Sequence, residues 1–190
     1  MLRRWIVLAI IGTLFCGVQA VSGAPGAAGY RLKGSDIVLP PGVPLGQYRR
    51  IFQPFPNWTL VCDENLKTRQ VVCNVSQTVI DTKGRQVFSW SLASEEGGQS
   101  DFILRTLPDA DTQAGIELQT VNMAGPIRVA FQGCNQKLCL GTTPVAGPLS
   151  EEIERGSSIV VTYHARNGEV RAYTLPLKGL KEAIASSGRH

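Results

Sequence analysis

The sequence predicts an all-β domain, an immunoglobulin-like antiparallel sandwich that ends in a short helix. Short segments with alternating apolar and polar residues recur from Trp58 to Leu175, and such alternation is typical of half-buried strands. Gly, Pro, Asn and Asp punctuate these segments at short intervals, as expected for strands joined by turns. No repeat period is visible. About 190 residues with 43% hydrophobic content suit one domain with a sizeable core.

Residues 1–20 are predicted to be an export signal. Arg3 and Arg4 form a positive start, Trp5 to Cys16 is apolar, and Val18 to Ala20 offers small residues at a cleavage position. The apolar run is shorter than the roughly 20 residues that span a bilayer, so we expect no stable membrane span after cleavage. Retention of the leader as an anchor, or lipidation at Cys16, stays open as an alternative.

Residues 21–50 are predicted to be a flexible linker or arm, followed by the β-sandwich domain at residues 51–190. The arm is rich in Gly, Ala and Pro, and Pro40 to Pro44 interrupts any regular element. Ile37 to Leu39 is a candidate short edge strand. The aromatic residues between Gln47 and Pro56 are expected to cap one end of the core.

The stretch from Trp58 to Cys73 is predicted to form a β-hairpin around which the domain is organised. Two apolar segments flank a polar run, and Cys62 and Cys73 stand on opposite sides of it. Trp58, like Trp90 further on, lies on the apolar side of its alternation and is expected to be buried. Further strands are predicted at 71–79, 87–93, 102–107, 116–120 and 127–131, with turns at 81–84 and 109–114.

The last third of the chain contains the strongest short-range signal. Asn167-Gly168 between two alternating segments predicts a hairpin of strands 158–165 and 169–175. Gly141 to Pro148 is predicted to be a loop, because it carries two prolines. Leu149 to Arg155 is expected to form a helical turn with Ser150 as its N-cap. Residues 176–187 have apolar side chains at helical spacing and predict a terminal helix.

Four cysteines remain beyond the leader: Cys62, Cys73, Cys134 and Cys139. An even number behind an export signal favours disulfides. Of the three possible pairings we favour Cys62–Cys73 and Cys134–Cys139, because each pair is close in sequence and faces across a hairpin. A zinc site is the alternative, but the usual C-x-x-C half-sites are absent. We therefore predict no metal site.

The charge pattern argues against nucleic-acid binding. The formal charge is +4, and removing Arg3 and Arg4 leaves 17 basic against 15 acidic residues. The remaining basic residues are scattered along the chain, and the only adjacent pair beyond the leader is Arg49-Arg50. A near-neutral surface without a basic stripe is typical of a solvated face.

The sequence lacks the usual catalytic patterns. It has no G-x-S-x-G elbow, no C-x-x-C and no Gly-rich phosphate loop between a strand and a helix. Only His164 and His190 are present as histidines, and we assign no catalytic residue and no cofactor. A periplasmic hydrolase that uses His164 with an unrecognised partner stays open as an alternative function.

The disulfide loop supplies the one candidate contact site. Its tip, Asn135, Gln136, Lys137 and Leu138, is held between Cys134 and Cys139. A bridge this local fixes the shape of its own tip, and a rigid loop is suited to recognition because its ordering entropy is already lost. The simpler alternative is that the bridge only joins one strand to the next.

From Phe55 to Ile184 the chain resembles the invasion-associated locus B family of exported bacterial proteins. The resemblance rests on the order and spacing of Trp58 to Cys62, Cys73, Gln77, Leu107-Pro108, Gly115-Ile116, Phe131, Cys134, Cys139 and Leu175 to Leu180 before Ala183. At Leu180 an aromatic residue is more usual in the family. The resemblance implies an immunoglobulin-like sandwich exported to the periplasm or outer surface of a Gram-negative bacterium. In pathogens the family is associated with invasion of host cells, and it offers no catalytic residues to transfer.

These observations together predict an exported, non-enzymatic binding or accessory protein, with a protein partner in the cell envelope or on a host cell. A structural protein of the envelope is a further alternative.

Overall fold

The computed structural model describes residue 39, residues 42–94 and residues 100–188. The predicted export signal at 1–20 lies outside the described residues, as do most of the predicted arm and residues 37–38 of the candidate edge strand. Leu39 itself is not in a strand. Within the described part of the chain, no helix is both long and apolar enough to cross a bilayer.

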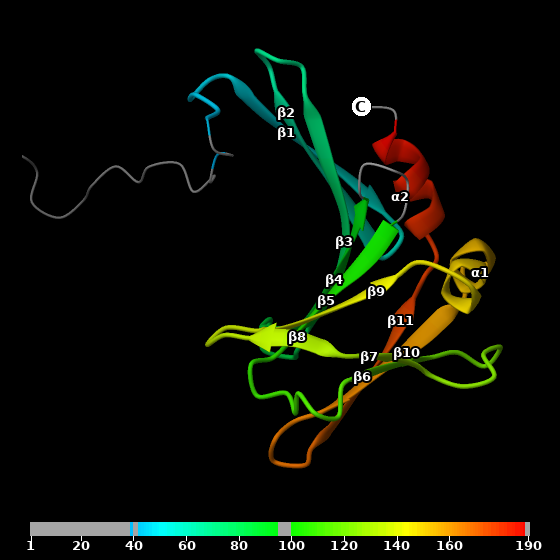
Figure 1. Ribbon diagram of the computed structural model, residues 1–190. Helices are drawn as coiled ribbons and strands as arrows, with labels where there is room; N and C mark the ends of the chain where they lie inside the picture. Colours follow the sequence, from blue (N-terminus) through cyan, green and yellow to red (C-terminus); the bar gives the residue numbers. More distant parts are fainter. Residues whose placement is uncertain (1–38, 40–41, 95–99, 189–190) are drawn as a thin grey trace, which may run out of the picture. The chain divides into compact units, whose positions relative to one another are not determined.

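Two antiparallel sheets form the folded unit (Figure 1). The seven-stranded sheet has the order β1-β2-β3-β4-β5-β9-β8, and the four-stranded sheet has the order β11-β10-β6-β7. The strands of the larger sheet are β1 Tyr48–Phe55, β2 Trp58–Asn65, β3 Val71–Ile80, β4 Gln86–Ser94, β5 Ser100–Thr106, β8 Phe131–Cys134 and β9 Cys139–Pro144. Those of the smaller sheet are β6 Ile116–Gln119, β7 Ile127–Val129, β10 Ser158–His164 and β11 Val170–Pro176. The predicted β-rich sandwich is confirmed.

The core lies between the two sheets and is centred on aromatic rings. Trp58, Trp90 and Phe102 pack together, with ring centroids 4.6 Å apart for Trp90 and Phe102 and 5.4 Å apart for the two tryptophans. Both tryptophans are buried, as the alternation predicted. The smaller sheet contributes apolar side chains from the inner faces of β6 and β10, including Leu118 and Val161.

A buried polar network joins the two sheets inside this core. The Trp90 indole N–H donates to Oε1 of Gln77 (2.9 Å), and Nε2 of Gln77 donates to the backbone carbonyl of Pro176 in β11 (3.1 Å). The indole N–H of Trp58 donates to the same carbonyl (3.3 Å). Each amide and indole group is thereby satisfied, as buried polar groups must be.

The predicted central hairpin is confirmed. Strands β2 and β3 pair antiparallel with Cys62 directly opposite Cys73, and a disulfide joins them. Asn65 starts the turn between the strands, where its side-chain oxygen accepts hydrogen bonds from the N–H groups of Lys67 and Thr68.

Strand β1 was not predicted, and it crosses the expected boundary between residues 50 and 51. It pairs with β2 along its whole length, from Tyr48 opposite Asn65 to Phe55 opposite Trp58. Tyr48 and Arg50 both bond the side chain of Asp63 across the pair. β1 is the edge strand of its sheet and is held by its pairing with β2. Its own sequence therefore showed only a weak alternation of apolar and polar residues.

The predicted strand at 127–131 is in fact two strands in different sheets. The chain leaves the smaller sheet after Val129 and enters the larger one at Phe131, with Ala130 between them. The predicted loop at 141–148 was also wrong, because its first four residues belong to β9. A Cβ at Gly141 would lie 3.1 Å from both the Ala130 carbonyl oxygen and Cγ1 of Val129. That glycine therefore marks a close approach of the two sheets.

Helix α1, Pro148–Arg155, is one residue longer at its start than predicted. Gly147 occupies the N-cap in place of Ser150, and Pro148 begins the first turn. Proline suits that position because its missing N–H would have no partner inside the helix.

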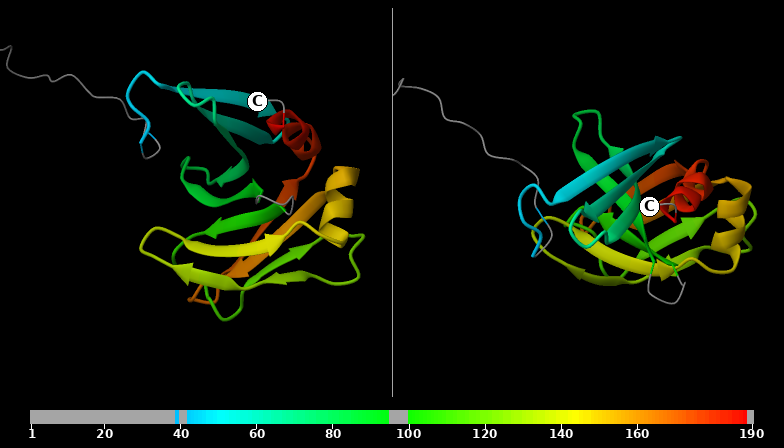
Figure 2. Two further views of the ribbon diagram at one scale, coloured as in Figure 1. Left: turned by 45° about the horizontal axis from the view of Figure 1, so that its top comes forward. Right: turned by 90° about the horizontal axis from the view of Figure 1, so that it is seen from above.

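Helix α2, Leu180–Ser187, packs on β2 and β3 (Figure 2). It begins later than predicted because Pro176 still belongs to β11. Gly179 precedes the helix with φ of +94°, and a Cβ there would lie 2.3 Å from the carbonyl oxygen of Pro56. Only glycine fits this left-handed, crowded position.

Candidate binding site at the Cys134–Cys139 hairpin

Strands β8 and β9 form a hairpin whose tip is the predicted contact loop. Cys134 and Cys139 are directly opposed across the pair and are joined by a disulfide. Four residues, 135–138, lie between them. The predicted pairing of all four cysteines is therefore present in the structure.

Asn135 gives the tip a defined backbone. Its side-chain oxygen accepts hydrogen bonds from the N–H groups of Lys137 (2.8 Å) and Leu138 (3.0 Å), and its own N–H donates to the carbonyl of Leu138 (2.9 Å). Asparagine commonly organises a turn in this way, by bonding the backbone two and three residues further on. The disulfide and these three bonds leave little conformational freedom in the tip.

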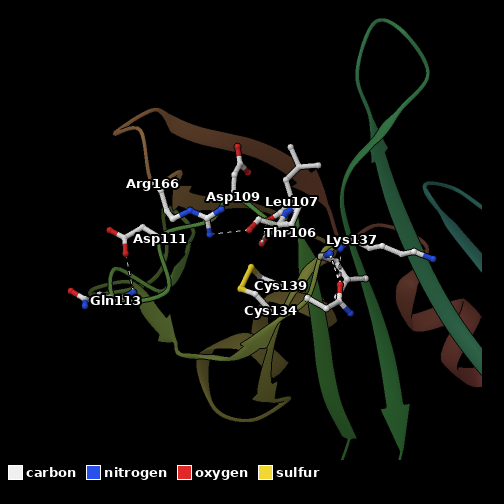
Figure 3. The surroundings of a disulfide bond; sticks show 12 residues. Thr106, Leu107, Asp109, Asp111, Gln113, Cys134, Lys137, Cys139 and Arg166 are labelled. Carbon is white, nitrogen blue, oxygen red and sulfur yellow. Dashed lines mark hydrogen bonds between the residues drawn. A yellow bond between two sulfur atoms is a disulfide. The ribbon is translucent and has the colours of Figure 1, made fainter.

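The tip presents different side chains to solvent and to the protein. Asn135, Gln136 and Lys137 are exposed, whereas Leu138 is half-buried. Figure 3 shows Lys137 on the far side of the tip from the disulfide, extending away from it. The polar end of the loop is thus open to solvent while its apolar residue faces the protein.

A pocket of about 250 Å³ lies where the tip meets the ends of β4 and β5. Residues of three segments line it: Gln86, Val87, Phe88, Arg105, Thr106, Leu107, Lys137 and Leu138. The structure thereby brings two of the four predicted contact residues, Lys137 and Leu138, to one pocket. Asn135 and Leu138 also line a shallower hollow of about 260 Å³ on the hairpin, while Gln136 lines neither.

Arg105 gives this pocket its electrostatic character. Its side chain is half-buried, and Nη1 donates to Oγ of Ser91 (2.9 Å) and to the carbonyl of Ile103 (3.3 Å). Burial lowers the pKa of the guanidinium from its ordinary value, yet arginine stays charged in proteins. Within the described part of the chain, no carboxylate forms an ion pair with it.

Among the described residues this half-buried cation is hydrogen-bonded only to neutral oxygens, so its charge is incompletely compensated there. Its planar guanidinium matches a carboxylate in two-pronged geometry, and Lys137 is a second basic residue among those that line the pocket. The hydroxyl of Thr106 donates to the carbonyl of Leu107, so it is already engaged. The chemistry of the pocket therefore fits a carboxylate with an apolar stem, which Leu138 and Val87 would contact.

The sequence indicated the tip but not Arg105. Arg105 shares the outward face of β5 with Asp101 and Ile103. A charged residue on the outward face of a strand is usually solvated, so its sequence position does not indicate a binding role. The tip lies about 30 residues further along the chain, so only the pairing of β5 with β9 brings Thr106 opposite Cys139.

His164 lies at the exposed end of β10. In the part of the chain that the structure describes, its imidazole makes no hydrogen bond or ion pair. Its backbone carbonyl accepts a hydrogen bond from the N–H of Asp111. The structure thus provides no oriented partner of the kind that the hydrolase alternative requires. No cluster of three or more metal-ligating side chains occurs among the described residues.

Comparison with known proteins agrees with this architecture. The profile of a family described as invasion associated locus B (IalB) protein matches residues 58–188. The crystal structure of invasion associated protein b from Bartonella henselae is similar, with a TM-score of 0.62 over 73% of this chain and 95% of that chain. The identity is 13%, so this likeness concerns the fold alone. No curated protein matches the chain.

The family profile covers most of the chain, including both disulfides and the buried Trp58, Gln77 and Trp90. The resemblance inferred from the sequence is confirmed: the chain belongs to the invasion-associated locus B family.

Proposed function

We propose that this chain is an exported, non-enzymatic binding protein that engages a protein partner through the tip of the β8–β9 hairpin and the adjoining pocket. The partner lies in the cell envelope or on a host cell. Export is supported by the predicted leader and by two disulfides, which persist in oxidising compartments. The family name connects similar proteins with invasion.

One observation carries the proposal: Lys137 and Leu138 of a rigid exposed loop share a pocket with Arg105, a cation that has no carboxylate partner in the described residues. Binding to such a loop costs little ordering entropy. An acidic side chain of the partner would supply the missing counter-charge, and truncating one member of a buried charge pair at an interface typically costs about 2–5 kcal/mol.

The test compares binding by folded variants. Oxidised wild-type protein and the Lys137→Ala/Leu138→Ser variant are used to capture proteins from envelope extracts and from host-cell surfaces. The affinity for each captured protein is then measured directly. We expect the double variant to bind at least about tenfold more weakly, a loss of about 1.4 kcal/mol or more, with an unchanged melting temperature. Arg105→Gln should weaken the same interaction.

Lys67→Ala is the matched control, because Lys67 is an exposed lysine at the tip of another hairpin, β2–β3. It should bind like wild type. Equal affinity of wild type and the double variant for every captured protein would remove the hairpin tip from the function.

A further inference from the structure

Strand β11 is an edge strand of the smaller sheet, so on one side it has no neighbouring strand within the described residues. The hydrogen bonds at both ends of the β10–β11 hairpin reveal which groups face that open edge. Ala165 N–H donates to the carbonyl of Glu169, and Leu177 N–H donates to the carbonyl of Ser157, both at 2.8 Å. Antiparallel pairs alternate between bonded and non-bonded. The backbone N–H and C=O groups of Arg171 and Tyr173 therefore form hydrogen bonds with β10.

The alternate residues, Val170, Ala172 and Thr174, direct their N–H and C=O groups to the open edge. Pro176, two positions further, has the same orientation, and its carbonyl accepts the hydrogen bonds from Trp58 and Gln77. The protein thus covers the last position of this edge with its own side chains. At the three preceding positions, no backbone bond to the edge side exists within the described chain.

A groove of about 510 Å³ runs along this part of the edge. The five consecutive residues from Glu169 to Tyr173 all line it. Because successive side chains of a strand point to opposite faces, a space in contact with all five lies at the edge of the strand. The opposite wall comes from the β3–β4 hairpin and the end of β5, through Val79, Ile80, Asp81, Arg85, Val87 and Leu107.

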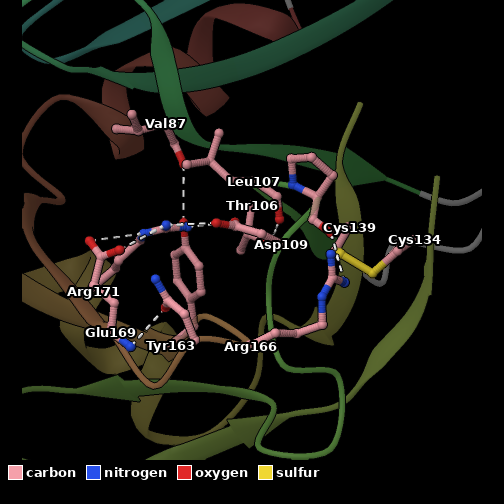
Figure 4. Close-up of polar contacts among 12 residues, drawn as sticks. Val87, Thr106, Leu107, Asp109, Cys134, Cys139, Tyr163, Arg166, Glu169 and Arg171 are labelled. Atoms are coloured by element: carbon pink, nitrogen blue, oxygen red, sulfur yellow. Dashed lines mark hydrogen bonds and ion pairs between the residues drawn. A yellow bond between two sulfur atoms is a disulfide. The ribbon is translucent and has the colours of Figure 1, made fainter. Parts of the chain in front are cut away.

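Figure 4 shows the polar side chains next to this groove and the contacts that they make with one another. Arg171 binds Asp109 (2.6 Å) and Glu169 (3.1 Å), and the Tyr163 hydroxyl donates to the carbonyl of Val87 across the two sheets. A further ion pair in the groove joins Arg85 to Asp81 at 2.7 Å.

Every charged side chain that lines the groove is thus paired within the protein. The large apolar side chains that the groove exposes to a partner are Ile80 and Val170, which are 62% and 57% exposed. This differs from the hairpin-tip pocket, where Arg105 has no carboxylate partner among the described residues.

Edges of natural sheets are usually protected by lysine, proline or bulges, because unpaired strands attract other strands. Between Val170 and Thr174 the only charged residue is Arg171, which points inward and is 13% exposed. The first protective residue is Pro176, at the end that Trp58 and Gln77 already cover. The edge is therefore open to another backbone along its first five residues.

We propose that the open edge of β11 binds an extended segment of a protein partner, which adds to the smaller sheet as a fifth strand. The segment is about five residues long, matching Val170 to Thr174 at about 3.4 Å per residue. It is uncharged, since the charges of the groove are already neutralised, and it has apolar side chains at alternate positions to contact Ile80 and Val170. Main-chain hydrogen bonds provide affinity in this mode and alternate side chains provide specificity.

The probe is the capped peptide acetyl-Val-Thr-Val-Thr-Val-amide, together with two versions that are N-methylated at either the odd or the even residues. Amide hydrogen exchange of the ¹⁵N-labelled full-length protein is followed by NMR. We expect the unmodified peptide to slow exchange at Ala172 and Thr174, while Arg171 and Tyr173 are already protected by β10. One N-methylated version should retain this effect and the other should lose it, because only one edge of the added strand faces β11.

Two variants at one position separate backbone bonding from folding. Ala172→Pro removes the edge-facing N–H without breaking a bond to β10, which is where a strand tolerates proline. It should weaken peptide binding by about tenfold or more. Ala172→Ser keeps the N–H and should bind like wild type. Equal tolerance of both methylation patterns, or equal binding by Ala172→Pro, would overturn the proposal. A dimer that Ala172→Pro converts to monomer would also overturn it, by making a second copy of this chain the occupant.

Discussion

The buried amide of Gln77 is the sharpest test of how the two sheets are held together. It is 7% exposed, accepts from the Trp90 indole at 2.9 Å and donates to the Pro176 carbonyl at 3.1 Å. The change Gln77→Leu keeps the approximate size of the side chain but removes both polar functions. Because the indole of Trp90 is fully buried, its N–H would then lack a partner.

The expected loss follows from the two bonds. A buried donor left without its acceptor costs about 1–3 kcal/mol, and the bond to Pro176 contributes about 1 kcal/mol. Losing the bond to Pro176 costs less than this, because Trp58 still donates to the Pro176 carbonyl. Leucine also has no polar group whose desolvation would oppose folding. We therefore expect Gln77→Leu to lower the free energy of unfolding by about 2 kcal/mol.

The measurement is urea unfolding of the oxidised protein, followed by tryptophan fluorescence, with the indole N–H of Trp90 monitored by NMR. Gln113→Leu is the matched control, because Gln113 is exposed in the turn before β6. Such a surface change should stay within about 0.5 kcal/mol of wild type. A loss below about 0.5 kcal/mol for Gln77→Leu, with the denaturant slope unchanged, would refute the view that this network joins the sheets.

Two further predictions concern the disulfides and acid stability. Replacing both Cys62 and Cys73 by serine should lower the free energy of unfolding by roughly 3 kcal/mol, because their bridge closes the longer loop. The bridge between Cys134 and Cys139 should contribute about 2 kcal/mol by the same entropy argument, and similar losses in urea unfolding would contradict this order. The bond from Arg171 holds the pKa of Asp109 below its ordinary value of 3.8. A depressed carboxyl pKa stabilises the fold above the unfolded value, and this contribution is lost as the pH falls through the folded pKa. Asp109→Asn should therefore narrow the stability difference between pH 6 and pH 2, whereas an unchanged difference would remove this ion pair as a cause.

Much of the fold was predictable because its signals are local. The alternation around Trp58 and Trp90 identified buried faces, and Asn167-Gly168 identified the hairpin that ends in β11. The two cysteine pairs were close in sequence, so short hairpins were enough to bring each pair together. These features depend on neighbours within a few residues, and sequence patterns report them well.

Edge strands and sheet changes were the weak points of sequence prediction. Strand β1 contains exposed Phe52 among charged and aromatic neighbours, so its alternation is indistinct. The change of sheet at Ala130 leaves no mark in the pattern, because Val129 and Phe131 remain apolar on either side of it. Gly141 reads as a loop residue in sequence, although the structure uses it to let two strands approach closely.

By itself, the sequence determined the β-rich class, the disulfide partners, the buried tryptophans and the rigid tip at residues 135–138. Only the tertiary structure decided that Arg105 joins Lys137 at one pocket, and that the open edge of β11 faces the β3–β4 hairpin. The physical reason is the separation along the sequence of the residues that interact. Alternation and turn chemistry act over a few residues, whereas both sites are assembled from segments about 20 to 90 residues apart, which meet only through the order of strands in the two sheets.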